Sequence, residues 1–203
     1  MRLIRPSHAL LAFAALALSS AASAHTGAPG HEHGGFMAGL LHPLTGLDHL
    51  AAMVAIGLWS ALSVPAGSQF PARVLWSPAW FAALLLGGAV LGWSGLELPG
   101  VEPMIAVSLL VTGLLVATRL ALPRAVSALV AGSFAVFHGL AHGAELPAAQ
   151  AAATLAGMLL ATLALHGAGV LAGWPLRRHV WAPRLAGGAV SLLGGVALWP
   201  ALV

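Results

Sequence analysis

Histidines and carboxylates are gathered in two short segments of an otherwise apolar chain. The residues are His42, Asp48 and His49 in the first segment and His138, His142 and Glu145 in the second. Their imidazole nitrogens and carboxylate oxygens suit borderline divalent ions such as Ni²⁺, Co²⁺, Zn²⁺ or Cu²⁺. The sequence contains no cysteine, which excludes thiolate zinc sites, iron–sulfur clusters and disulfides. We therefore expect a divalent-metal site with nitrogen and oxygen ligands.

Helical spacing places the members of each segment on shared faces. His42 and His49 are seven residues apart, which corresponds to two turns along one face of a helix. In the second segment, the i, i+4, i+7 spacing places the three side chains on one helix face, within about 60° of one another. Two imidazoles one turn apart bind an ion together, and a carboxylate one turn further on adds charge and a third ligand.

Further histidines lie before and after these two segments in the sequence. His166 stands alone in a later apolar stretch, where it is either a deeper ligand or a hydrogen-bonding residue between helices. The segment 25–35 contains His25, His31 and His33 among glycines. Short histidine-rich tracts of this kind capture metal ions, the alternative being a solvated linker.

The composition requires a membrane around these segments. Of 203 residues, 60% are hydrophobic and 6% are charged, and the mean hydropathy is +0.96. A soluble domain carries about a quarter charged residues, so a soluble protein is excluded, and the chain is too apolar to be disordered. The arginines are scattered between apolar runs, which does not indicate nucleic-acid binding. We predict an all-α integral membrane protein.

The chain divides into a leader, a tail and six spans. Residues 1–24 combine a basic start, a short apolar run and an Ala22-Ser23-Ala24 cleavage site, which predicts a cleavable signal peptide. The histidine-rich tail follows at 25–35, and the domain 36–203 holds the spans. Proline and glycine clusters divide it into predicted helices at 36–64, 75–96, 101–121, 125–145, 148–174 and 184–202.

Charge and tryptophan positions orient these spans. Alternate loops carry all the arginines of the spanning domain, namely Arg73, Arg119, Arg124, Arg177, Arg178 and Arg184. The opposite loops carry Glu97, Glu102 and Glu145 and no arginine. The positive-inside rule therefore places both ends of the mature chain outside. All seven tryptophans fall near predicted span ends, where indole rings anchor at the headgroups.

Small residues predict close helix contacts within the bundle. The pairs Gly88 with Gly92, Gly139 with Gly143, and Gly169 with Gly173 each have G-x-x-x-G spacing. Such spacing lets two helix backbones approach closely. We assign these glycines to packing.

Three functions fit a buried histidine–carboxylate set. A permease would pass the ion from the outer tail through sites at successive depths. An intramembrane zinc hydrolase would hold Zn²⁺ with His138, His142 and another histidine, while Asp48 or Glu145 acts on a metal-bound water. A membrane metal sensor or metallochaperone would bind the ion without net flux. The spread of sites and the histidine-rich tail favour the permease, and no P-loop motif for ATP hydrolysis is present.

Both segments resemble signatures of the HupE/UreJ family. The first is HPLTGLDHLAAM at 42–53, followed by Gly57-Leu58-Trp59, and the second is FHGLAHGAE at 137–145. The resemblance covers the signal segment, the tail and the six spans. It implies a nickel permease of the bacterial inner membrane that supplies hydrogenase or urease maturation proteins. It also implies that the six residues of the two segments carry Ni²⁺ as the transported ion, with no permanent cofactor.

Overall fold

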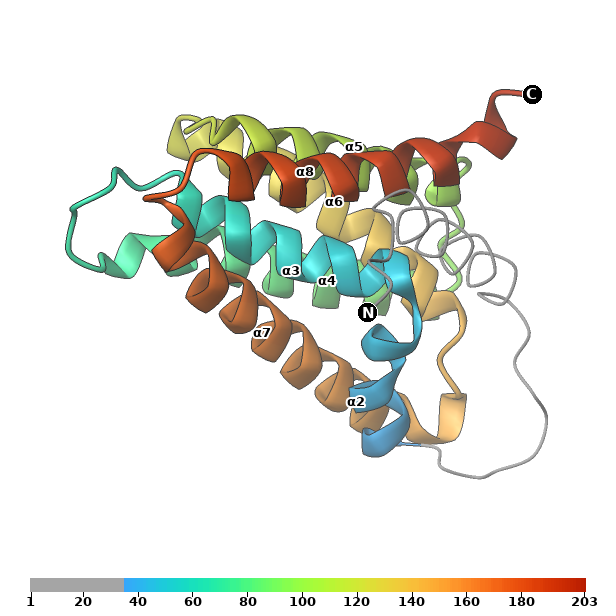
Figure 1. Cartoon of the computed structure of the whole chain (residues 1–203). Helices are drawn as coiled ribbons and strands as arrows, with labels where there is room; N and C mark the ends of the chain where they lie inside the picture. Colours follow the sequence, from blue (N-terminus) through green and yellow to red (C-terminus); the bar gives the residue numbers. More distant parts are fainter. Residues whose placement is uncertain (1–34) are drawn as a thin grey trace, which may run out of the picture. The chain divides into compact units, whose positions relative to one another are not determined.

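The computed structural model describes residues 35–203, and within this range every regular element is helical. The predicted signal peptide and His25, His31 and His33 lie outside the described residues. The α-helices in chain order are α2 (Phe36–Thr45), α3 (Leu47–Leu62), α4 (Trp76–Trp93), α5 (Val101–Thr118), α6 (Arg124–Ala144), α7 (Ala151–Leu176) and α8 (Trp181–Leu198) (Figure 1). Three short 3-10 helices are η1 (Ala72–Leu75), η2 (Ala148–Gln150) and η3 (Trp199–Ala201).

The predicted helix boundaries agree with the structure except inside the first span. The ends of the other five differ from the observed ends by at most four residues. The prediction of one helix over 36–64 is wrong, because α2 and α3 meet at an angle of 85°. Pro43 removes a backbone donor from α2, and Gly46 takes an extended conformation with φ −95° and ψ 118°. The bend therefore follows from two helix-weakening residues that lie close together.

Four helical segments are long and apolar enough to cross a membrane within the described range. They are Ala72–Trp93, Val101–Thr118, Arg124–Ala144 and Ala148–Leu176, and the bent α2/α3 pair makes a fifth if it counts as one span. Helix α8 is not among them, since Pro183 and Arg184 in its first turn lower its hydropathy. The protein is thus a helical, multi-pass membrane protein, and a sixth span at α8 stays a prediction.

Glycines pack the helices in pairs, backbone against backbone. A Cβ on these glycines would collide with the backbone of the partner helix. They are Gly88, Gly92, Gly139 and Gly143 between α4 and α6, Gly57 and Gly169 between α3 and α7, and Gly113, Gly187 and Gly194 between α5 and α8. Helix α2 joins α7 in the same way, through Gly39 and Gly157. The predicted role of the G-x-x-x-G glycines in packing is confirmed.

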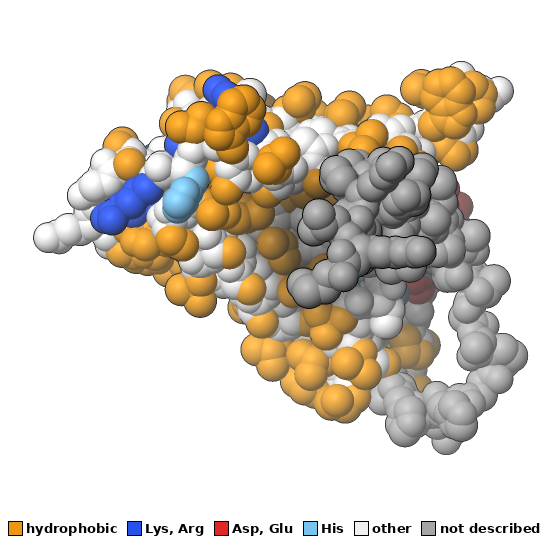
Figure 2. Space-filling view, viewed as in Figure 1, with side chains coloured by type: hydrophobic (Ala, Val, Ile, Leu, Met, Phe, Trp, Pro, Cys, Tyr) orange, Lys and Arg blue, Asp and Glu red, His pale blue; other side chains and the backbone are white. Residues whose placement is uncertain are grey.

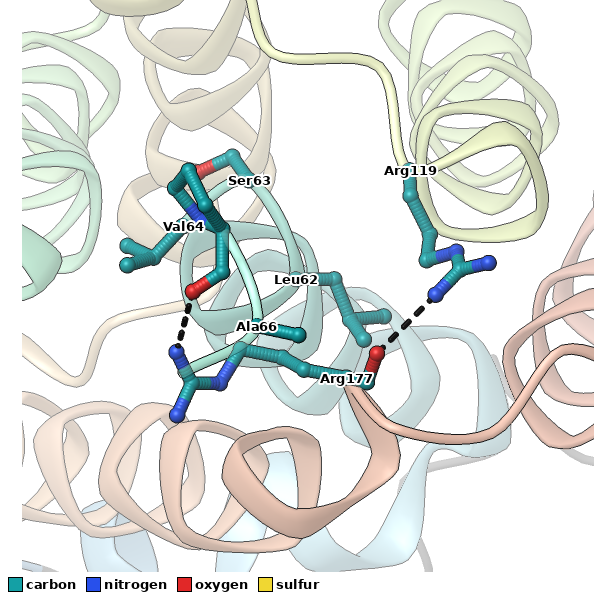
Figure 3. Close-up of a pocket in the computed structure, with 7 residues that line it drawn as sticks. Leu62, Ser63, Val64, Ala66, Arg119 and Arg177 are labelled. Atoms are coloured by element: carbon teal, nitrogen blue, oxygen red, sulfur yellow. Dashed lines mark hydrogen bonds between the residues drawn. The ribbon is translucent and has the colours of Figure 1, made fainter. Parts of the chain in front are cut away.

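Arginines and acidic residues lie at opposite ends of the face that Figure 2 shows. At the arginine end, a pocket of about 300 Å³ lies between the segment 62–66, Arg119 and Arg177 (Figure 3). Nη1 of Arg177 donates to the Pro65 carbonyl at 2.9 Å, and Nη1 of Arg119 donates to the Arg177 carbonyl at 3.1 Å. The Arg177 guanidinium also stacks on Trp174, 3.2 Å from the ring centroid. These contacts fasten the arginine-side ends of α3, α5 and α7.

An apolar core fills the bundle between the bend and the arginine end. Met53, Ile56 and Trp59 lie on successive turns of α3 and pack with residues of α4, α5 and α6. Trp59 is 2% exposed and donates from Nε1 to the Leu120 carbonyl at 2.9 Å. The expectation that all seven tryptophans anchor at the headgroups is therefore wrong for Trp59, which is a core residue.

Candidate metal-binding site

Asp48 and His49 begin α3 directly after the bend. Oδ1 of Asp48 accepts a hydrogen bond from the His49 backbone N–H at 2.9 Å and another from Nδ1 of the same residue at 2.9 Å. Because a carboxylate only accepts, we assign the ring proton to Nδ1, which leaves a free lone pair on Nε2. That Nε2 atom is buried and has no hydrogen-bond partner within the described residues.

The bend also brings His42 against α6. Nε2 of His42 lies 3.0 Å from Nδ1 of His142, so the two rings share a hydrogen bond. The His42 and His49 rings are 6.1 Å apart. On a straight helix, the predicted two-turn separation would put them about 10 Å apart, so that part of the prediction is wrong. The two rings come this close because the chain bends by 85° at Gly46.

His138 and His142 lie one turn apart on α6 and are 0% and 3% exposed. The Ser108 hydroxyl on α5 donates to the Ile105 carbonyl at 2.6 Å, and its oxygen lies 2.9 Å from Nε2 of His138. Since the hydroxyl proton is already used, His138 must donate from Nε2, which leaves the lone pair on Nδ1. Nδ1 of His138 is buried without a partner in the described part of the chain.

Together, His42, His49, His138 and His142 form what we call the four-histidine cluster. The His49 ring centroid lies 4.4 Å from that of His142 and 5.3 Å from that of His138. Exposure falls from Asp48, at 32%, and His49, at 16%, to the buried histidines of α6. The cluster thus runs inward from the end of the bundle opposite the arginines.

The donors of the cluster are close together but are not arranged around one point. Within residues 35–203, no three His, Asp or Glu side chains form a group that could hold a metal ion as they stand. However, buried ring nitrogens of His49, His138 and His142 have no hydrogen-bond partner there. Buried polar atoms in proteins are nearly always hydrogen-bonded, so three unpaired nitrogens in adjacent rings require an explanation.

The rings of His49 and His138 are held in the way that is common for metal-binding histidines. Histidines that bind metals usually donate their second ring N–H to a carboxylate, carbonyl or similar acceptor, which fixes the tautomer. Asp48 does this for His49, and Ser108 does it for His138. Each of these two rings is therefore held through one nitrogen and has an unpaired lone pair on the other.

Glu145 differs in position from the two histidines of its segment. Helix α6 ends at Ala144, and Glu145 is its C-cap residue, with φ −96° and ψ 0°. Its side chain is exposed, and within residues 35–203 it forms no hydrogen bond. The carboxylate is nevertheless close enough to act electrostatically on His42. Glu145 thus lies at the outer margin of the cluster, and its role as a ligand stays a prediction.

Sequence reasoning missed the residues that orient the rings. Ser108 carries no signal of its own, because a serine that bonds its own helix backbone is common in apolar helices. The Met53 carbonyl, which accepts from Nδ1 of His166 at 2.7 Å, is a backbone group that no side-chain pattern reveals. His166 itself is 1% exposed and lies outside the four-histidine cluster.

The fold and the site together define a helical membrane protein with a buried histidine cluster at one end of its bundle. The family model described as "HupE / UreJ protein" matches residues 13–198. The chain is 43% identical over 191 residues to Protein HupE of Rhizobium leguminosarum bv. viciae, covering 91% of this chain and 94% of that protein. No solved structure matches the chain. The chain belongs to the HupE/UreJ family.

Proposed function

We propose that the protein is a nickel permease that moves Ni²⁺ through the membrane toward the arginine-bearing side. In this proposal, the N-terminal histidines and Glu145 attract the ion. His42, Asp48, His49, His138 and His142 then carry it inward. By the positive-inside rule the arginine-bearing side faces the cytoplasm, so the transport is uptake.

One observation carries the proposal: three neighbouring rings of the cluster each have a buried nitrogen without a partner. Neutral imidazole is a ligand for Ni²⁺, and the donor set contains no thiolate that would favour softer ions. Conduction requires that each position bind the ion and also release it, and several neighbouring imidazoles offer a series of such positions. The choice of nickel rests on the association of the HupE/UreJ family with hydrogenase and urease.

The protein would lie in the bacterial cytoplasmic membrane with six spans, α8 being the last, and deliver Ni²⁺ to nickel-enzyme maturation proteins. Ni²⁺ is the substrate, and no resident cofactor is needed. The membrane potential supplies about 2.3 kcal/mol per charge per 100 mV, and about twice that for a divalent ion.

The test is uptake of ⁶³Ni²⁺ into proteoliposomes that hold the purified protein, with and without an imposed potential. We expect saturable uptake that is lost in His49→Ala and retained in His179→Ala, because His179 is exposed in the loop after α7. Excess Co²⁺ or Zn²⁺ in the assay measures selectivity. Binding of nickel without entry into the lumen would contradict the permease function and would favour a metal sensor or a hydrolase.

A further inference from the structure

A second pair of unpaired polar atoms lies beyond the four-histidine cluster. They are Nε2 of His166 and Oγ1 of Thr162, both on α7, in side chains that are 1% and 0% exposed. We propose that these two atoms form a second, deeper cation-binding position that receives Ni²⁺ from His138. This inference rests on the proposed function and extends it by one step along the path.

The two residues lie one turn apart on α7. Residues four apart on a helix lie on the same face, one turn above the other, so Thr162 and His166 are neighbours. Nδ1 of His166 donates to the Met53 carbonyl at 2.7 Å, which fixes the tautomer and leaves the lone pair on Nε2. His49 and His138 show the same pattern, in which one ring nitrogen donates a hydrogen bond and the other has no partner.

The second position is deeper in the bundle than the cluster. His49 and Met53 lie one turn apart on α3, about 6 Å along its axis, and His166 is attached at Met53. The direction from His49 to Met53 leads away from the bend and toward the arginine end. An ion that leaves the cluster in the uptake direction therefore meets His166 next.

Phe81 of α4 lies next to both positions. Its ring centroid lies 5.9 Å from that of His138 and 5.2 Å from that of His166, and its side chain is 1% exposed. An aromatic ring offers no lone pair to a metal, so an ion that moves from Nδ1 of His138 to Nε2 of His166 gains no ligand from Phe81. Two donor positions beside one apolar ring are consistent with a stepwise path.

A purely structural His166 is the alternative to be tested. In that case, the only role of His166 would be to donate the hydrogen bond to the Met53 carbonyl. The variant His166→Asn separates the two roles, because asparagine offers an N–H near the place of Nδ1 but has no atom at the place of Nε2. The variant Thr162→Val keeps the shape of the side chain and removes only the hydroxyl.

The experiment measures ⁶³Ni²⁺ binding to the purified protein and ⁶³Ni²⁺ uptake into proteoliposomes for the same variants. We expect His166→Asn to keep the nickel affinity of the cluster, to lose the nickel bound at the second position, and to show uptake that is lower by about tenfold or more. Thr162→Val should show a smaller fall in uptake, also with the affinity of the cluster unchanged. Tryptophan fluorescence during heating checks that each variant is folded, and Thr162→Val carries the test if His166→Asn is unstable.

The outcomes separate this inference from the proposed function. If both variants take up nickel at the unaltered rate while His49→Ala does not, the deeper position is wrong and the permease stands. A loss of nickel affinity at the cluster itself, together with a fall in uptake by the folded variants, would make His166 part of the packing around the cluster, which also overturns the deeper position. If the unaltered protein takes up no nickel, both proposals fall together.

Discussion

His42 on α2 and His142 on α6 share a hydrogen bond of 3.0 Å between Nε2 and Nδ1. The two residues are 100 positions apart in the chain, and they belong to different glycine-packed helix groups. His42 reaches this position because α2 leaves the axis of α3 by 85°. The bond therefore joins the two sequence segments that carry the proposed site.

Replacing His42 or His142 should weaken nickel binding through this shared contact. We expect His42→Ala and His142→Ala each to raise the Kd for Ni²⁺ about tenfold. We expect the Kd of the double variant to be about the same as that of the single variant that binds Ni²⁺ less tightly. The reason is that residues in contact have non-additive effects. Isothermal titration of the purified protein measures the three values. Fully additive losses would show that the two rings act independently.

The Asp48 carboxylate should matter through His49. In Asp48→Asn, the amide oxygen can still accept from Nδ1, but the charge that raises the basicity of the ring is lost. We expect Ni²⁺ affinity to fall about tenfold, less than in His49→Ala, which removes the ligand itself. Glu97→Gln is the control, since Glu97 is exposed in the loop between α4 and α5. Equal losses for Asp48→Asn and Glu97→Gln would point to a general effect of surface charge.

Ser108 provides a test of tautomer control. Both Ser108 and Ser133 donate to a carbonyl three residues earlier, but only Ser108 also contacts a histidine. In Ser108→Ala, His138 loses the acceptor for Nε2–H, so its ring is free to take the other tautomer. We expect nickel uptake to fall about tenfold, whereas Ser133→Ala should be unchanged. Similar uptake by the two variants would argue against a fixed tautomer at His138.

Glycine packing predicts a difference in stability between two positions on α7. A Cβ at Gly169 would collide with the Val54 carbonyl of α3, whereas a Cβ at Gly167 meets nothing within 4 Å. Overpacking costs about 1–3 kcal/mol, so Gly169→Ala should lower the midpoint of thermal unfolding by several degrees. Gly167→Ala should leave it unchanged or raise it slightly. Tryptophan fluorescence in detergent measures both midpoints, and equal values would refute the close α3–α7 contact.

Much of the fold could be predicted because apolar runs and proline–glycine breaks determine where membrane helices begin and end. The bend at Gly46 could not, since a single glycine after Pro43 is also compatible with a continuous span. The position of a residue in a sequence motif likewise did not always predict whether its side chain is buried. His138 and His142 are buried as the spacing predicts, but Glu145 lies past the last residue of α6, where the helical periodicity no longer applies.

The orienting groups of the site depend on contacts between distant parts of the chain. Ser108 meets His138 across 30 residues, and the Met53 carbonyl meets His166 across 113. Such contacts arise from the packing of α5 on α6 and of α3 on α7, which no local spacing specifies. The histidines themselves were predictable because ionisable residues are costly inside a membrane and so mark sites of function.

The three glycine-packed groups have a consequence for how the path opens. The close backbone contacts join α2, α3 and α7 into one group, α4 and α6 into a second, and α5 and α8 into a third. The bonds of His49 to Asp48 and of His166 to Met53 lie inside the first group, so a rocking of the groups against one another would leave them in place. The bonds of His42 to His142 and of His138 to Ser108 cross between groups, so the same motion would break them. Alternating access would then release the ion from α6 while the donors of α3 and α7 keep their geometry.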